Sequence, residues 1–431
     1  MPQVSRRYRV LWAVCIGVLA VLVVGLSLTL DRINPQEAQA SQATLEERVN
    51  AYLADANISD GVTELAIELH VSPDDDDLRF AVGFLQFADA VQTFGQSWYQ
   101  YGLNSQNWFS QIIPFLRLPV PLNPDPEPIS NRDFRQSLET FVENLTTAEE
   151  TLSQIQSETV QLGVYFGRAY LDFDADGQGS DPEALWRIYA ELNRGASITA
   201  EQAETFLIKL DAGDVQWLRG YCHFLSALLE FYLAHDDSRL FDHTAHLFFE
   251  KPETSYSFLR NIDQLSEGYI SLMDAAAFIH LVALPVQDRN RSQAAIAHLQ
   301  QMIQLSRETW ALYGQETDDD HEWIPNPNQT GVVPGVTITE EMVQQWLSFL
   351  DEADSILAGE TLVPFWRGNS PVGVNLNRVF MEPQGADLVL WVQGTAAAPY
   401  LEDGTLTQPE FWQRLWNSFN GRFVGFALWF N

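Results

Sequence analysis

The sequence predicts a mainly α-helical protein with a few short strands, preceded by an N-terminal hydrophobic signal or anchor helix. Apolar residues recur at spacings of three and four in residues 214–234 and 262–279, which is typical of helices that face a core. The chain is 46% hydrophobic and contains 13 Trp and 26 Phe, so its 431 residues can bury a large core. Strand-like alternation is confined to a few short stretches, which argues against a large sheet as the basis of the fold.

Further helices are expected from the same spacing and from capping signals. A third strong helix is expected from Thr337, which has capping-box spacing to Glu340 and is followed by one apolar stripe. The other expected helices span 43–55, 78–101, 131–155, 183–193, 289–313 and 407–418. Strands are expected at 160–166, within 386–394 and within 421–430.

The N-terminus carries a hydrophobic segment. Residues 10–30 contain no charged side chain and are long enough to span a bilayer, and three arginines precede them within residues 1–9. This arrangement predicts that residues 1–40 are a signal peptide or a transmembrane signal-anchor, and that residues 41–431 are exported to the periplasmic or extracellular side. An A-x-A cleavage signature ends at Ala40, far beyond the apolar run, so cleavage and retention both stay open.

The charge balance restricts the partners. The chain has 58 acidic and 24 basic residues, a net charge of −34, which disfavours nucleic acid and anionic lipid headgroups and attracts cations. Only two cysteines are present, and Cys15 lies in the hydrophobic segment, so Cys222 has no partner for an intrachain disulfide in the exported region. A bound metal would therefore be a useful means of stabilising the exported chain.

One proline-rich segment is a candidate domain boundary. Residues 114–130, "PFLRLPVPLNPDPEPIS", contain six prolines and interrupt the helical pattern. The exported region is thus expected to be either continuous or divided near this segment.

The stretch "DFDADGQGSDPE", residues 172–183, has the composition of a calcium loop. Three aspartates alternate, a glycine follows where the backbone must turn sharply, and a glutamate stands at the twelfth position. The expected ligands are the carboxylates of Asp172, Asp174 and Asp176, the backbone carbonyl of Gln178, the hydroxyl or a bridging water at Ser180, and the carboxylate of Glu183. Without a cation, four carboxylates this close together would repel one another.

This loop resembles that of the EF-hand family over residues 172–193, the loop and the helix that leaves it. Two residues depart from the family pattern: Gly179 stands where an aliphatic residue usually pairs two hands, and Ala184 replaces a large apolar residue. The segment that enters the loop also has strand character. The resemblance therefore implies a single loop that binds Ca²⁺ for structure, and not a paired sensor.

Two other clusters offer alternative chemistry. Residues 235–246 contain three histidines and three aspartates, and His243 and His246 have the spacing to share a helical face and bind Zn²⁺. Residues 318–322, "DDDHE", offer a second cation site or an acid/base pair. No nucleophile elbow, P-loop or dinucleotide fingerprint is present in its required context, so an enzyme is the less favoured reading.

The sequence as a whole favours an exported or membrane-anchored, calcium-binding structural or binding protein of the cell envelope. Its expected partners are the membrane, if the N-terminal helix is retained, and a protein or glycan, whereas nucleic acid is not expected. The alternative function is a metal-dependent hydrolase built on residues 235–246.

Overall fold

The computed structural model describes residues 43–105, 110, 113–192, 205–260, 267–332, 337–367 and 372–429. The predicted N-terminal helix at 10–30 lies outside these ranges. Within them, no helix combines the length and the hydropathy needed to cross a bilayer.

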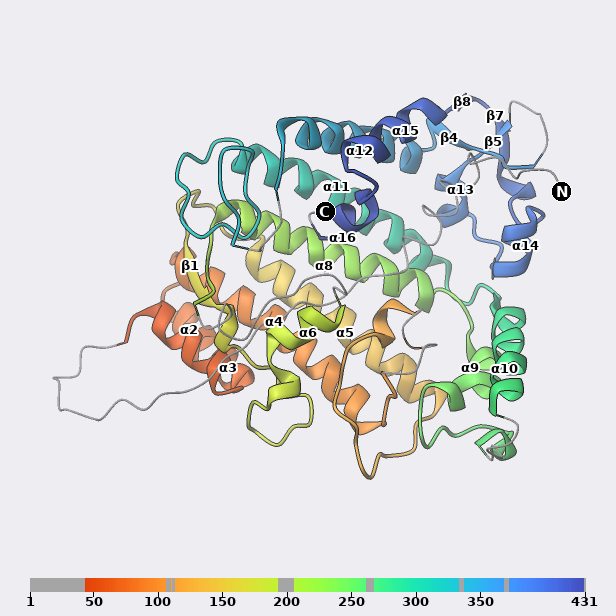
Figure 1. Ribbon diagram of the computed structural model, residues 1–431, viewed down its shortest axis with the longest axis horizontal. Helices are drawn as coiled ribbons and strands as arrows, with labels where there is room; N and C mark the ends of the chain where they lie inside the picture. The colour runs from red at the N-terminus through yellow and green to blue at the C-terminus, as the bar shows by residue number, and fades with distance from the viewer. Residues whose placement is uncertain are drawn as a thin grey trace.

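Five long helices run side by side across the middle of the molecule (Figure 1). In packing order they are α4 (Asp76–Gln100), α5 (Asn131–Leu152), α8 (Ala212–Leu233), α11 (Arg289–Tyr313) and α12 (Glu340–Ala358). Two shorter helices, α2 (Leu45–Ala54) and α3 (Ile58–Val71), pack against α4. The expectation of a mainly helical body with a few short strands is confirmed.

The main core is rich in aromatic side chains. Phe94 of α4 stacks on Phe141 of α5 with ring centroids 4.3 Å apart, and the fully buried Trp98 packs edge-on against Phe94. Such offset and edge-to-face pairs add to the free energy gained by burying the rings. The segment 114–130 contributes buried side chains to this same core, and the indole of Trp98 donates to the carbonyl of Phe115 at 3.0 Å. A division of the body near this segment stays a prediction.

Side-chain caps define where the long helices begin. The Ser130 hydroxyl accepts from the amide of Asp133, whose carboxylate accepts from the amide of Ser130, so α5 begins with the reciprocal capping box. The α12 helix begins two residues later than expected, because Thr339 and not Thr337 is its cap and accepts from the Met342 amide at 3.2 Å.

Within the described residues, the strands form three small sheets. The expected strand at 160–166 is confirmed as β1 (Leu162–Tyr165), which pairs antiparallel with β2 (Leu207–Leu210). Two-residue strands β3 (Ala283–Leu284) and β6 (Ala386–Asp387) also pair antiparallel. A four-stranded sheet has the order β7-β5-β4-β8, with only β4 and β8 parallel. Its strands are β4 (Thr361–Pro364), β5 (Val372–Val374), β7 (Leu401–Asp403) and β8 (Thr405–Leu406).

The strand expected within 386–394 is limited to the two residues of β6, and the strand expected within 421–430 was wrong. After β6 the chain turns into α14 (Leu388–Gln393), because the Asp387 carboxylate caps this short helix by accepting from the Leu390 amide at 2.8 Å. The last apolar stretch forms α16 (Phe423–Trp429), and Phe426 packs against Trp346 of α12. In runs this short, apolar residues alone do not distinguish a strand from a buried helix.

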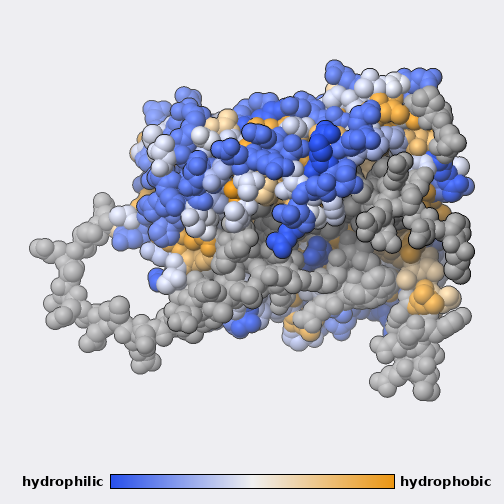
Figure 2. All heavy atoms as spheres, turned by 45° about the horizontal axis from the view of Figure 1, so that its top comes forward, coloured by the Kyte–Doolittle hydropathy of each residue, from blue (hydrophilic) through white to orange (hydrophobic). Residues whose placement is uncertain are grey.

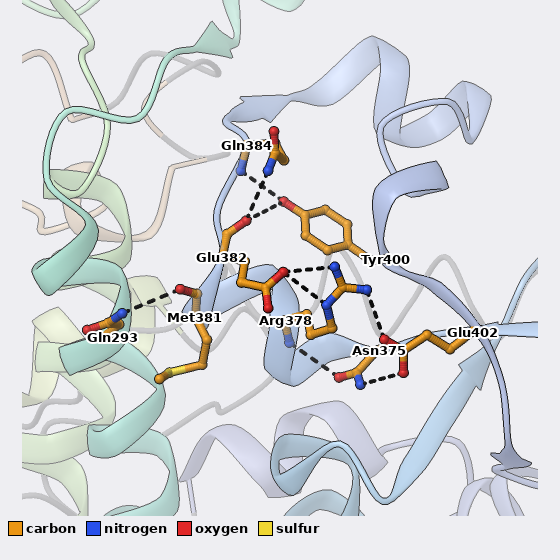
Figure 3. Close-up of polar contacts among 8 residues, drawn as sticks. All are labelled: Gln293, Asn375, Arg378, Met381, Glu382, Gln384, Tyr400 and Glu402. Carbon is orange, nitrogen blue, oxygen red and sulfur yellow. Dashed lines mark hydrogen bonds and ion pairs between the residues drawn. The ribbon is translucent and has the colours of Figure 1, made fainter.

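The remaining helices are shorter than the five long ones. They are α6 (Leu185–Leu192), α9 (Ser238–Thr244), α10 (Glu267–Leu281), α13 (Leu376–Met381) and α15 (Pro409–Ser418). Figure 3 shows how α13 is tied to its surroundings: Arg378 forms ion pairs with Glu382 and with Glu402 of β7, and the Gln293 side chain of α11 donates to the Met381 carbonyl.

Candidate metal centre

The acidic loop is fixed at its first residue by a buried helix. The backbone amide of Asp172 donates to the side-chain oxygen of Gln92 at 3.0 Å, and the side-chain Nε2 of Gln96 donates to the Asp172 carbonyl at 2.7 Å. Both glutamines belong to α4. Two residues earlier, the Tyr170 amide donates to the Leu53 carbonyl of α2 at 2.9 Å. The start of the loop is therefore joined to two helices that lie more than 70 residues away in sequence.

Three of the predicted ligands converge. Each of Asp172, Asp174 and Asp176 offers a carboxylate oxygen, and these three oxygens lie within 4.8 Å of one another. Asp172 is 6% exposed, Asp174 is half-buried and Asp176 is exposed, so the cluster opens to solvent on the Asp176 side. Three carboxylate oxygens at this separation form one side of a coordination shell for a hard cation.

Backbone amides hold the aspartates in place. The carboxylate of Asp172 accepts from the amides of Asp176 and Gly177, each at 3.1 Å, and that of Asp176 accepts from the Gln178 amide at 2.8 Å. Gly177 has a φ of +78°, a conformation that glycine adopts without the steric cost of a Cβ. The sixth position of the loop thus has the sharp turn that the sequence predicts.

Glu183 closes the loop from its other end. One oxygen of its fully buried carboxylate accepts from the amides of Phe173 at 2.8 Å and Asp174 at 3.1 Å. The other oxygen accepts from the amide and the hydroxyl of Ser180. Glu183 is not a member of the three-aspartate group, and its role as a ligand stays a prediction. In this structure it bridges the two halves of the loop.

The electrostatics of the loop favour a cation. Burial raises the pKa of Asp174, and the neighbouring carboxylates of Asp176 and Asp172 raise it further. Burial also raises the pKa of Glu183. Tyr99 of α4 has a raised pKa, first because it is partly buried and then because of the charges of Asp174, Glu183 and Asp176. Negative charge is thus concentrated here at a free-energy cost that a bound cation would remove.

The structure explains the two departures from the EF-hand pattern. A Cβ at Gly179 would overlap the ring of Tyr170, so the ring of Tyr170 takes the space that a side chain at the eighth position would need. Tyr170 also forms an antiparallel bridge with Ala184, directly after the loop. The chain that enters the loop comes from β1 through a short 3-10 turn, Phe166–Arg168, and not from a helix. The residues on the two sides of the loop therefore pair with each other, and no second loop is needed for this pairing.

A second acidic group lies at the C-terminal end of β2, where Asp211 follows the strand. Oxygens of Asp211, Glu316 and Glu322 lie within 4.8 Å of one another. Burial, followed by the charge of Asp211, raises the pKa of Glu316 to about 9, and burial raises that of Glu322 to about 6. Protons therefore neutralise part of this group near neutral pH. Of residues 318–322 only Glu322 joins it, whereas Asp320 forms an ion pair with Lys209.

Most residues of the 235–246 cluster have structural partners. His235 is buried with Nδ1 2.8 Å from the Phe231 carbonyl, and the buried Asp237 forms an ion pair with Arg135 at 2.8 Å. His243 packs on the Tyr256 ring, and His246 lies 3.6 Å from Asp274 of α10. Within the described residues, no group of three ligand-bearing side chains includes a member of this cluster. The predicted zinc ligands therefore do not converge.

Comparison with known proteins adds no family or function. No protein-family model matches the chain, and no curated protein or solved structure is similar to it. The function is therefore inferred from the geometry of the loop.

Proposed function

We propose that residues 172–183 bind Ca²⁺ and that the ion stabilises the fold of an exported or membrane-anchored protein of the cell envelope. The observation that carries the proposal is the convergence of Asp172, Asp174 and Asp176 within a twelve-residue loop whose sixth residue has the required turn. Gln178, Ser180 and Glu183 are the further proposed ligands. The chemistry of this donor set, all oxygen and mostly anionic, suits calcium better than softer metals.

The proposed effect of the ion follows from the position of the loop. Asp172 is joined to α4, Tyr170 to α2, and Glu183 is followed directly by α6. An ion held by the loop would fix these three elements relative to one another. Because it would bind only the folded chain, calcium at 100 times its dissociation constant would add about 2.7 kcal/mol to the free energy of unfolding.

The proposed location follows from the sequence. Residues 10–30 can span a bilayer and the chain has a net charge of −34, so we infer export and contact with the membrane through the N-terminal segment when it is retained. A protein or glycan is the proposed partner, and nucleic acid is not, because the acidic surface would repel phosphate. The role is therefore structural or binding rather than catalytic.

Thermal unfolding tests the calcium proposal. The full-length protein is unfolded in chelator and in millimolar calcium, together with the double variant Asp172→Ala/Asp174→Ala. We expect calcium to raise the midpoint of the parent by several degrees and to leave the double variant unchanged. Asp181→Asn is the matched control, because Asp181 lies in the same loop but is exposed and forms an ion pair with Arg187. Its response to calcium should equal that of the parent, and no response in the parent would refute the proposal.

The hydrolase alternative has less support. It needs zinc at residues 235–246, where His243 and His246 face Tyr256 and Asp274 in separate contacts. Metal analysis of the purified protein separates the two functions: one equivalent of Ca²⁺ without Zn²⁺ favours the structural role, and stoichiometric Zn²⁺ favours the enzyme.

A further inference from the structure

One end of this acidic molecule carries an apolar surface, formed by α10 and α14. The side chains of Leu272, Met273 and Ile279 on α10, and of Leu388, Val389 and Val392 on α14, are exposed; Leu272 is 63% exposed and Val389 is 45% exposed. We call this surface the apolar tip. In Figure 1 the two helices lie one above the other at the right-hand end of the molecule. Orange hydrophobic surface gathers at that end in Figure 2, whereas the surface at the upper left is mostly blue.

The two helices of the tip form one continuous unit. The chain leaves α10 at Leu281, and the carbonyl of Val282 accepts from the Leu388 amide at the start of α14, at 2.8 Å. The paired strands β3 and β6 complete this junction. The inner side of α10 is already occupied, because Phe278 packs edge-on against Phe248 and Asp274 faces His246. Leu272, Met273 and Ile279 are therefore the outward side chains of a helix that is already packed.

Packing and hydrogen bonds fix α14 of the apolar tip to the rest of the molecule. Trp391 of α14 stacks on Tyr400 with centroids 6.0 Å apart and planes 7° from parallel. The Tyr400 hydroxyl accepts from the Gln384 amide at 2.8 Å and donates to the Glu382 carbonyl at 3.4 Å (Figure 3). Because the Trp391 side chain packs inward against Tyr400, Leu388, Val389 and Val392 are held on the exposed side of the same short helix.

We propose that the apolar tip inserts into the surface of a lipid bilayer. The exposed positions of α10 from Leu272 onward and those of α14 include no Asp, Glu, Lys or Arg. The tip is therefore a place where a chain of net charge −34 can meet an uncharged or zwitterionic bilayer without removing charged groups from water. Aliphatic side chains at a bilayer interface contribute in proportion to the apolar area they bury and need no complementary shape.

The size of the tip argues against a second copy of the chain as the occupant. A stable protein interface takes about 20–30 residues from each side. The α14 helix has only 6 residues and α10 has 15, of which the outward face is a fraction. A small apolar surface of this kind suits a fluid bilayer better than a rigid protein partner.

The N-terminal segment would keep a bilayer close to the tip. This step rests on the membrane location proposed above, in which residues 10–30 span the bilayer. Residues 31–44 connect that segment to α2 and can extend to about 50 Å. Although α2 lies at the opposite end of the molecule from the tip (Figure 1), a connection of this kind does not fix which side of the body faces the surface. Tethering raises the effective concentration of the bilayer, so a modest apolar area is enough for binding.

Depth-dependent fluorescence quenching tests the proposal on the full-length chain in phosphatidylcholine vesicles. Single thiols are introduced as Leu272→Cys or Val389→Cys in a Cys15→Ser background, in which the remaining Cys222 is buried. Each thiol is labelled, and quenching by spin-labelled lipid is measured. Glu308→Cys on the exposed side of α11 is the control. We expect at least threefold more quenching at positions 272 and 389 than at 308, and equal quenching at all three positions would overturn the proposal.

Two further measurements separate this proposal from the others. A label on native Cys15, in the parent chain, reports whether the N-terminal segment enters the bilayer: quenching there without quenching at position 389 would refute the tip and leave the anchor intact. Val389→Asp should abolish the quenching of a label at Ile279→Cys, with the same result in calcium and in chelator. Cross-linking of two chains through Val389→Cys, with no lipid quenching, would assign the surface to self-association and also overturn the proposal.

Discussion

The side-chain oxygen of Gln92 accepts a hydrogen bond from the backbone amide of Asp172 at 3.0 Å, so a residue of α4 fixes the backbone at the first residue of the acidic loop. Gln92 is only 3% exposed, and the bond joins residues 80 positions apart. The geometry of the proposed calcium site is therefore set partly by the helical core and not by the loop alone. Such supporting contacts are what hold metal ligands in a productive arrangement.

Replacing Gln92 tests this dependence. Gln92→Leu keeps the size of the side chain but leaves the Asp172 amide without its acceptor, which should cost about 1–3 kcal/mol. We expect the loss in chelator as well as in calcium, together with weaker calcium binding. Denaturant unfolding at several calcium concentrations measures both. An unchanged calcium affinity would mean that the loop holds its own geometry.

Substitutions of Asp174 and Glu183 should have different effects on the stability of the protein in chelator. Asp174 lies among like charges that raise its pKa, so Asp174→Asn should leave the protein in chelator equally stable or slightly more stable. Glu183 is fully buried and accepts four hydrogen bonds, so Glu183→Ala should lose at least about 3 kcal/mol in chelator. Glu183→Ala should lose the stabilisation by calcium, whereas Asp174→Asn should only weaken it, because an asparagine carbonyl can still coordinate the ion at the third position. Equal behaviour of the two in chelator would show that Glu183 does not bridge the loop.

Gly179 should be intolerant of any side chain. Gly179→Ala places a Cβ against the Tyr170 ring, and the overlap should cost about 1–3 kcal/mol. Gly177→Ala is the informative comparison, because that Cβ meets nothing within 4 Å and its cost, about 1 kcal/mol, comes only from the positive φ. Thermal unfolding of both variants in chelator measures the difference. A smaller loss at Gly179 than at Gly177 would contradict the packing of Tyr170 described above.

The sequence predicted the long helices and the aspartates because both depend on local spacing. The α4, α5 and α11 helices have long apolar stripes, and Asp172, Asp174 and Asp176 lie within five residues of one another. It did not predict α14, because five consecutive apolar residues fit either period, and the outcome depends on the Asp387 cap.

Contacts between distant segments could not be predicted from the sequence. Asp211 and Glu316 converge although 105 positions separate them, and nothing near either residue indicates the other. The same is true of Gln92 and Asp172. A run of acids such as 318–322 marks a place where charge gathers, but only the fold decides that Glu322 turns inward while Asp320 pairs with Lys209. The sequence could indicate that a cluster existed, but not which residues formed it.

The buried acids around Asp211 should make the protein less stable as the pH rises. The pKa of Glu316 is about 9 and that of Glu322 about 6, and burial holds the pKa of Asp214 well above its usual range. These groups bind protons more tightly in the folded chain than in the unfolded chain, where a glutamate titrates near 4.3. The contribution of these groups to the free energy of unfolding should therefore fall between about pH 4.5 and pH 9, as the folded chain is forced to give up its protons. Buried histidines such as His298, whose pKa is lowered to about 4, act in the opposite direction only below about pH 6.5.

Melting curves in chelator from pH 5 to pH 9 measure this dependence without a contribution from bound calcium. Glu316→Gln keeps the shape of the side chain and removes the titrating group, so its midpoint should fall less steeply with pH than that of the parent, with most of the difference above pH 6. Glu308→Gln is the control, because Glu308 is exposed on α11 and should leave the slope unchanged. A parent midpoint that rises from pH 6 to pH 9 would show that Glu316 is ionised in the folded chain, and the close approach of Asp211 and Glu316 would then require a bound cation in place of a proton.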